Sequence, residues 1–295
     1  MKGKRHIQII SPSGTINPDY IEGASQRLRI WGYNVSESAH ARGKYGRFSG
    51  TDAERLADLN AALSDSSVDY ILCSRGGYGL QRIIDRIHGP FDKCLIGFSD
   101  ITALHQRYAL AGKPSIHGLM CKHIATLPED CEALQLFRKA LAGEALSYEL
   151  PAHPLNRFGE AEGTLIGGNL SVLYGLQGTP YSLNAVLDAH PEGCILFLED
   201  IGERHYHIDR MMNNLRMSGV LSRLKGLIVG QFSDCDEDPL MRCSVYTTIL
   251  EAVAPYSYPV LFNFPAGHVE DNRPLRMNTS VSLSVKEDKI KVSTM

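Results

Sequence analysis

The sequence predicts an α/β protein whose first half is a parallel sheet with helices on both faces and whose second half is mixed and richer in β-strands. Three observations lead to this fold class. Short apolar runs alternate with helical patterns through the first half. A stretch rich in Pro, Gly and polar residues interrupts the pattern near the middle. The end of the chain alternates apolar and polar residues with a period of two.

The first strand and helix have clear boundary signals. The apolar run Ile7–Ile10 has the length of a buried strand and is followed by Ser-Pro-Ser-Gly. Asn17 and Pro18 suit the cap and first position of a helix, because an Asn side chain accepts from free amides and Pro lacks an amide hydrogen. Gly32 ends the helical pattern, whose apolar residues lie on one face: Ile21, Ala24, Leu28 and Trp31.

The alternation of helix and strand then repeats, beginning with a capping box from Thr51 to Glu54. Parallel strands need crossover connections of about a dozen residues, usually helices, so this order predicts a parallel sheet. The predicted elements are a helix with Leu56, Leu59 and Leu63, a strand at Tyr70–Cys73, a helix through Ile83 and Ile84, a strand at Leu95–Gly97 and a helix from about Ile101 to Ala111.

The middle of the chain is predicted to be a linker. Residues 143–158 lack helical periodicity and are rich in Pro, Gly and polar side chains. We therefore expect a first domain at 1–145, a linker at 146–161 and a second, β-rich domain at 162–295. A terminal hairpin is expected around Lys286–Asp288. Further strands are expected near Thr164–Ile166, Cys194–Leu198, Leu227–Val229 and Val260–Phe264.

Composition argues against several classes of protein. The net charge is −3 and no basic stripe occurs, so nucleic acid is not an expected partner. The apolar run near the start is shorter than that of a secretion signal, and no run approaches the ~18 residues of a membrane span. The seven cysteines contain no CxxC pair, so we expect reduced core thiols in a cytoplasmic protein without membrane contact.

Ser99 is the first candidate for chemistry. It lies in Gly97-Phe98-Ser99-Asp100, between an apolar strand and a predicted helix. A serine on such a turn presents its hydroxyl above the sheet, with the next amide and the helix N-terminus near a developing oxyanion. The match to G-x-S-x-G is only partial, because Ile101 stands where the second Gly would be. The alternative is that Ser99 or Asp100 simply caps the helix.

A glycine-rich turn, Arg75-Gly76-Gly77-Tyr78-Gly79, also follows a strand. Its glycines allow backbone amides to face a ligand. The spacing matches neither the dinucleotide fingerprint nor the P-loop, which leaves an oxyanion-hole donor near Ser99 or a plain tight turn as interpretations.

Glu199 and His268 complete the set of candidates. Glu199 ends the apolar run Cys194–Leu198, and carboxylates at the carboxyl end of a buried strand often point into a site. Glu203 is the competing carboxylate, and the alternative is that one of the two caps the following helix. His268 follows an apolar strand and a Pro-Ala-Gly turn. No sequence pattern of a zinc site is present, so no metal is expected.

Ser99, Glu199 and His268 supply the residue types of a catalytic triad: a hydroxyl, a carboxylate and a base. The competing histidines are His205 and His207, expected at the surface or at a helix start, and His117 and His123, for which the alternatives are a position lining a cleft and a structural position.

The chain resembles the LD-carboxypeptidases, the muramoyltetrapeptide carboxypeptidases, a serine peptidase family that also includes the microcin C immunity protein. The resemblance covers nearly the whole chain and is specific through the order of its motifs. These motifs are SPSG at Ser11–Gly14, FSGTDAERLADLN at Phe48–Asn60, SRGGYG at Ser74–Gly79, GFSD at Gly97–Asp100, GTLIGGNLSVL at Gly163–Leu173, GTP at Gly178–Pro180, LFLEDIGE at Leu196–Glu203 and PAGH at Pro265–His268.

The resemblance implies Ser99 as nucleophile, Glu199 as orienting carboxylate and His268 as base. The amide of Asp100, with one from Gly76 or Gly77, would form the oxyanion hole. It also implies a Rossmann-like or flavodoxin-like first domain, a smaller β-rich second domain, a site between them and a homodimer. We expect the reaction to need no cofactor. Arg75 is a candidate for binding the carboxylate of the substrate's terminal D-Ala, or alternatively pairs with a nearby acid.

The substrate implied by the resemblance is a murein tetrapeptide, whose terminal D-Ala is released during peptidoglycan recycling. Immunity-type members instead cleave a peptidyl-nucleotide. The only tryptophan, Trp31, lies in the first helix, so no indole is available in the second domain to stack on a nucleobase. A third hypothesis, of a different class, is a non-catalytic binding protein on a flavodoxin-like scaffold.

Overall fold

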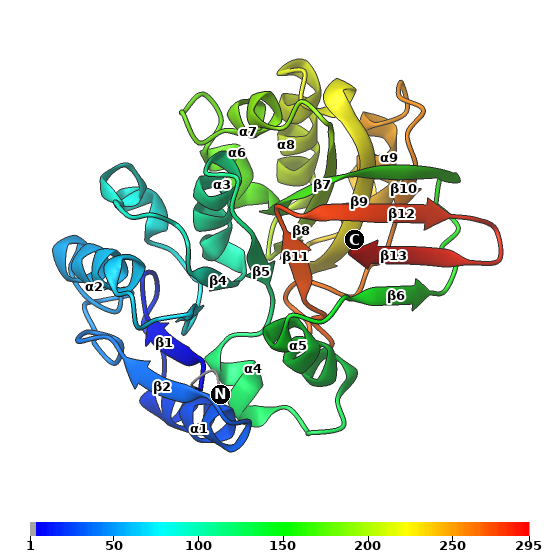
Figure 1. The fold of residues 1–295 in the computed structure, drawn as a ribbon. Helices are drawn as coiled ribbons and strands as arrows, with labels where there is room; N and C mark the ends of the chain where they lie inside the picture. Colours follow the sequence, from blue (N-terminus) through cyan, green and yellow to red (C-terminus); the bar gives the residue numbers. More distant parts are fainter. Residues whose placement is uncertain (1–3, 295) are drawn as a thin grey trace.

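The computed structural model describes residues 4–294, which form two β-sheets with helices packed around them (Figure 1). The first sheet has the strand order β2-β1-β3-β4-β5-β11. Neighbours from β2 to β5 run parallel, and β11 is antiparallel to β5. Its strands are β1 (His6–Ile10), β2 (Asn34–Glu37), β3 (Tyr70–Cys73), β4 (Cys94–Gly97), β5 (Ser115–His117) and β11 (Leu275–Met277).

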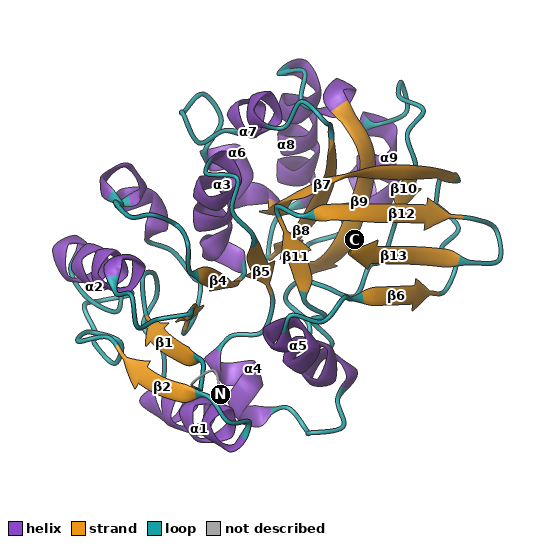
Figure 2. Ribbon diagram, in the orientation of Figure 1, coloured by secondary structure: helices purple, strands orange, loops and turns teal. Residues whose placement is uncertain are grey.

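Helices cover both faces of the first sheet (Figure 2), and the helical caps lie where the sequence predicts them. Ile7 and Ile9 of β1 belong to the same core cluster as residues of α1 (Pro18–Ile30) and α4 (Cys121–Thr126). Ile10 belongs to a different cluster, with residues of α2 (Asp52–Ser64) and α3 (Thr102–Leu110). The parallel α/β prediction is confirmed. The helices of this half are α1 (Pro18–Ile30), α2 (Asp52–Ser64), α3 (Thr102–Leu110), α4 (Cys121–Thr126) and α5 (Glu132–Ala142).

The second sheet is mixed and has the strand order β10-β9-β8-β7-β12-β13-β6. The strands from β7 to β10 run parallel, whereas β12, β13 and β6 are joined by antiparallel pairing. Its strands are β6 (Ser147–Leu150), β7 (Gly159–Asn169), β8 (Cys194–Ile201), β9 (Leu224–Ser233), β10 (Val260–Leu261), β12 (Ser280–Val285) and β13 (Ile290–Thr294). The helices that follow these strands are α6 (Leu170–Gly175), α7 (Leu183–Ala189), α8 (His205–Met217) and α9 (Val245–Ala252).

Strand β11 connects the two halves of the molecule. It comes from the C-terminal part of the chain, yet Leu275 pairs with His117 at the edge of the first sheet. The segment between β10 and β11 therefore runs from the second sheet to the first. His268 lies on this connection, so the topology itself carries the histidine toward the sheet that precedes Ser99.

Three predicted elements differ from those observed. Two 3₁₀ turns, Leu80–Arg82 and Ile84–Arg86, replace the helix expected through Ile83, because the backbone at Ile83 leaves the helical region with a φ of −128°. Strand β10 stops at Leu261, shortly before Asn263, whose φ is +63°. The expected linker at 146–161 contains β6, which pairs with β13 and so belongs to the second sheet. The domain boundaries themselves stay a prediction.

All seven cysteines have free thiols. Cys73, Cys121 and Cys194 are buried as expected of core residues, whereas the other four, Cys94 among them, are only partly buried. Burial raises the pKa of the Cys94 thiol to about 12. Within residues 4–294, no helix combines the length and the apolar character needed to cross a lipid bilayer.

Candidate active site

Ser99 lies on a sharp turn two residues beyond β4, at the carboxyl end of that strand. Its φ is +65°, a left-handed conformation that costs a non-glycine residue roughly 1–2 kcal/mol. A Cβ at Gly97 would lie 2.9 Å from the Ile101 side chain, which explains the glycine before this turn. Neither the 3₁₀ turn Ser99–Ile101 nor α3 has a side-chain cap. The alternative in which Ser99 or Asp100 only caps the helix is therefore wrong.

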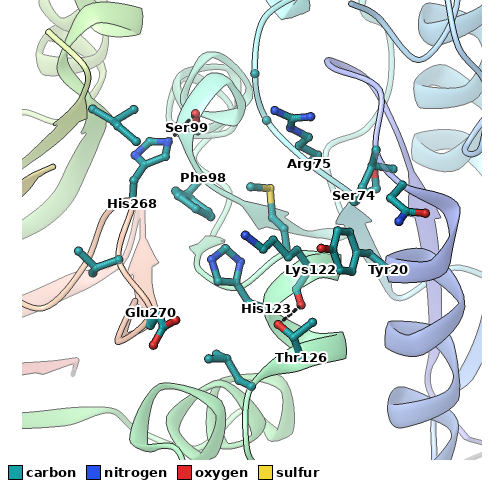
Figure 3. Close-up of a pocket in the computed structure, with 18 residues that line it drawn as sticks. Tyr20, Ser74, Arg75, Phe98, Ser99, Lys122, His123, Thr126, His268 and Glu270 are labelled. Carbon is teal, nitrogen blue, oxygen red and sulfur yellow. Dashed lines mark hydrogen bonds between the residues drawn. The ribbon is translucent and has the colours of Figure 1, made fainter. Parts of the chain in front are cut away.

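A chain of hydrogen bonds joins Ser99, His268 and Glu199. His268 Nε2 is 3.0 Å from Ser99 Oγ, and His268 Nδ1 is 2.8 Å from Glu199 Oε2. Glu199 is fully buried. In the tautomer in which Nδ1 donates to this carboxylate, Nε2 is left as an acceptor for the Ser99 hydroxyl. Figure 3 shows the His268 ring directed at Ser99.

The backbone around His268 is fixed by its neighbours. Gly267 has a φ of +135°, and a Cβ there would lie 3.3 Å from Glu199 Cβ, so glycine allows the histidine loop to approach β8 closely. The Gly267 amide donates to buried Asn272 Oδ1 at 3.0 Å. The sequence analysis did not identify Asn272, because an isolated Asn carries no signal in a single sequence. Phe98 packs edge-on against the His268 ring, with centroids 5.0 Å apart.

The competing histidines occupy other environments. His205 begins α8, and a helix start was one of the two positions predicted for it. It is buried, however, and its Nε2 lies 2.8 Å from Thr248 Oγ1. His207 pairs with Glu203 at 3.1 Å, so the competing carboxylate faces a different histidine from His268. Burial lowers the pKa of His123 to about 4 and that of His117 well below its ordinary value. Of these two, His123 lines the cavity beside Ser99, whereas His117 is fully buried.

The glycine-rich turn lies directly against Ser99. A Cβ on Gly76 would be 2.8 Å from Ser99 Cβ and 3.1 Å from Ser99 Oγ, so only glycine fits this contact without displacement. Gly77 has a φ of +104°, which also favours glycine. Within the described chain, the Gly76 and Gly77 amides donate to no protein acceptor. They are therefore available to an oxygen bound beside Ser99.

Ser99 and His268 open onto a cavity of about 830 Å³. Arg75 lines it and donates from Nη1 to the Thr15 carbonyl at 2.8 Å, and no acidic partner of Arg75 occurs within residues 4–294. Tyr20, Lys122 and Glu270 also line the cavity and were missed by the sequence analysis (Figure 3). The described part of the chain contains no group of three or more metal-ligating side chains.

Two family models match the chain, in the order of its two sheets. The LD-carboxypeptidase N-terminal domain matches residues 7–118, and the LD-carboxypeptidase C-terminal domain matches residues 162–283. The Ser99 turn falls within the first match and Glu199 and His268 fall within the second.

Known proteins resemble the chain over nearly its full length. The murein tetrapeptide carboxypeptidase of Pseudomonas aeruginosa is 31% identical over 281 residues, which are 90% of this chain and 89% of that protein. A muramoyltetrapeptide carboxypeptidase from Oxalobacter formigenes superposes with a TM-score of 0.84 at 28% identity, covering 98% of each chain. The microcin C7 self-immunity protein shares the fold, with a TM-score of 0.83 at 20% identity, covering 100% of this chain and 97% of that chain. Together with the two family models, these matches establish that the chain belongs to the LD-carboxypeptidase family.

Proposed function

We propose that this carboxypeptidase is a serine enzyme that hydrolyses the L,D-peptide bond holding the terminal D-Ala of a murein tetrapeptide. The observation that carries the proposal is the hydrogen-bonded chain from Ser99 through His268 to Glu199, at a cavity large enough for a peptide. The arrangement supplies the three roles that acyl transfer to a serine requires.

In the proposed reaction, His268 Nε2 takes the proton of Ser99 Oγ while that oxygen attacks the carbonyl carbon before D-Ala. Glu199 holds the imidazole in the required tautomer and stabilises the imidazolium that forms. The proton then passes to the departing D-Ala amine. Water, deprotonated by His268, hydrolyses the acyl-serine and restores the enzyme.

The oxyanion of the tetrahedral intermediates would be bound by backbone amides. The amide of Asp100 begins the turn into α3, and the amides of Gly76 and Gly77 lie in the turn against Ser99. Because these amides lie beside Ser99, we assign the three residues to the oxyanion hole. Removing one such donor typically costs about 10²–10³ in kcat.

The charges of the cavity support a substrate rich in carboxylates. Arg75 and Lys122 both line it, and within the described chain neither has an acidic partner. A carboxypeptidase must recognise a free terminal carboxylate, and we assign this role to Arg75 because it adjoins the glycines beside Ser99. Lys122 would neutralise a second carboxylate of the peptide, and Glu270 would bind an amino group.

We regard peptidyl-nucleotide hydrolysis as the less favoured alternative. Trp31 follows α1 and lines a separate surface pocket, so it offers no indole to a nucleobase at the triad. We also propose that the protein is a cytoplasmic homodimer acting in peptidoglycan recycling. Light scattering of the purified protein tests the dimer.

Mass spectrometry of murein tetrapeptides and of a peptidyl-nucleotide, each incubated with the protein, tests the proposed function. We expect loss of D-Ala from the tetrapeptide, at least 10³-fold slower in His268→Ala. The variant His207→Ala is the matched control and should retain activity. Turnover of the nucleotide conjugate alone would reject the murein substrate, and near-normal turnover by His268→Ala would reject the assigned base.

A further inference from the structure

We propose that Asp100 is a positioning residue, whose carboxylate holds the glycine-rich turn at the distance from Ser99 that the oxyanion hole requires. This inference rests on the proposed function, because it explains how the oxyanion-hole amides are kept in place. It assigns a role to the Asp100 side chain, whereas the oxyanion hole uses only its backbone amide.

The Asp100 carboxylate joins two loops that follow neighbouring strands of the first sheet. Its Oδ2 accepts from Ser13 Oγ at 2.7 Å and from the Leu80 amide at 3.0 Å. Ser13 belongs to the loop after β1, and Leu80 follows the glycine-rich turn after β3. Asp100 is 3% exposed and Ser13 is 0% exposed. A buried carboxylate with two donors is a strong and specific tie between these segments.

Two further sets of hydrogen bonds join the same two loops. The Gly14 amide donates to the Gly76 carbonyl at 3.0 Å. Arg55, which is 1% exposed, donates from Nη1 to the carbonyls of Pro12 and Gly79. Burial raises the pKa of Asp100, and the Ser13 hydroxyl, the Leu80 amide and the positive charge of Arg55 oppose this rise. The turn is therefore held at Gly76 itself and, beyond Gly77, at Gly79 and Leu80.

These contacts bear on catalysis because Gly76 of the turn packs directly against Ser99. The Cβ position of Gly76 lies only 3.1 Å from Ser99 Oγ. Asp100 is adjacent to Ser99 in sequence, so the hydrogen bond that its carboxylate accepts from the Leu80 amide fixes the far end of the turn relative to the serine itself. Loss of this bond would let the Gly76 and Gly77 amides move away from the oxyanion.

Three variants and a matched pair of controls test the proposal. Ser13→Ala removes one donor, Asp100→Ala removes the acceptor, and Asp100→Asn keeps an oxygen that can accept from both donors. The controls are Ser38→Ala and Asp58→Asn, because Asp58 Oδ2 likewise accepts from a serine hydroxyl, at 2.7 Å, and from a backbone amide, at 2.9 Å. Neither control residue lines the cavity.

The readouts are kcat, KM, the thermal midpoint and the affinity for a peptide boronate, which forms a tetrahedral adduct with a serine. We expect kcat to fall about 10²-fold in Asp100→Ala and about 10-fold in Ser13→Ala, with KM changed less than about 3-fold and boronate affinity reduced in parallel with kcat. Asp100→Asn should recover most of the lost activity. The controls should lower the thermal midpoint without lowering kcat.

Two results would overturn the inference. One is an Asp100→Ala enzyme that folds and retains the wild-type kcat and boronate affinity. The other is a fall in kcat that the controls reproduce at an equal loss of thermal midpoint, which would assign Asp100 to stability alone. Failure of the proposed function is a separate result, since a wild-type protein without D-Ala release would show it before any variant is compared.

Discussion

Replacing Gly76 by Ala should impair catalysis far more than it impairs folding. The added Cβ would lie 2.8 Å from Ser99 Cβ, whereas carbon atoms in contact are normally about 3.5–4.0 Å apart. Ser99 or the turn must therefore move by about 1 Å. A misplacement of about 1 Å at a reacting group costs about 100-fold in rate, whereas an extra methyl in a packed region costs about 1–3 kcal/mol of stability.

The assay is D-Ala release per folded molecule, with the folded fraction measured by circular dichroism. Gly163→Ala is the matched control, because its Cβ would lie 2.8 Å from the Gly193 carbonyl oxygen in the second sheet, away from the cavity. We expect a comparable loss of stability in both variants and an activity loss only in Gly76→Ala. Wild-type kcat/KM in folded Gly76→Ala would refute the reasoning.

The remaining predictions concern the carboxylate of the triad, the arginine assigned to the substrate carboxylate and one buried histidine. Glu199→Gln should lower kcat, though less than His268→Ala does, and Glu203→Gln should lower it only slightly; a larger effect at Glu203 would show that the wrong carboxylate was chosen. Arg75→Lys should raise KM about 10-fold with little change in kcat, and an unchanged KM would exclude a bidentate carboxylate contact. Burial lowers the pKa of His105 from 6.5 to about 4, so between these values the unfolded chain binds a proton that the folded chain does not. The folded protein thus loses stability as pH falls from 6.5 to 4. In His105→Gln, the free energy of unfolding measured in urea should decline less over this window than in the wild type, by up to about 1.4 kcal/mol per pH unit. Equal slopes in both proteins would contradict this assignment.

The parallel first sheet could be predicted because its signals are local. The cap at Asn17 and the capping box from Thr51 to Glu54 lie in adjacent residues, and the structure contains both. Strand β6 was missed because its four residues are stabilised by pairing with β13, about 140 residues later in the chain. The two 3₁₀ turns after Gly79 were missed for a related reason, since Asp100 and Arg55 hold this segment from distant parts of the sequence.

Some residues of the candidate site could likewise be predicted from the sequence and others could not. Ser99, Glu199 and His268 could be named from strand-end positions and from the family motifs, and the structure brings their side chains within hydrogen-bond distance. Their catalytic roles stay a proposal. Lys122 and Glu270 could not be named, because a charged residue on a helix or loop resembles any solvated surface residue until the fold shows a cavity beside it.

The role of Ser99 is tested most directly by measuring D-Ala release and the thermal midpoint on the same sample of Ser99→Ala. Alanine adopts the left-handed conformation at this position at about the same cost as serine, and the hydroxyl caps no helix, so the midpoint should stay close to that of the wild type. We predict that D-Ala release falls to background while the protein remains folded. A folded Ser99→Ala protein that releases D-Ala at the wild-type rate would contradict the proposed mechanism.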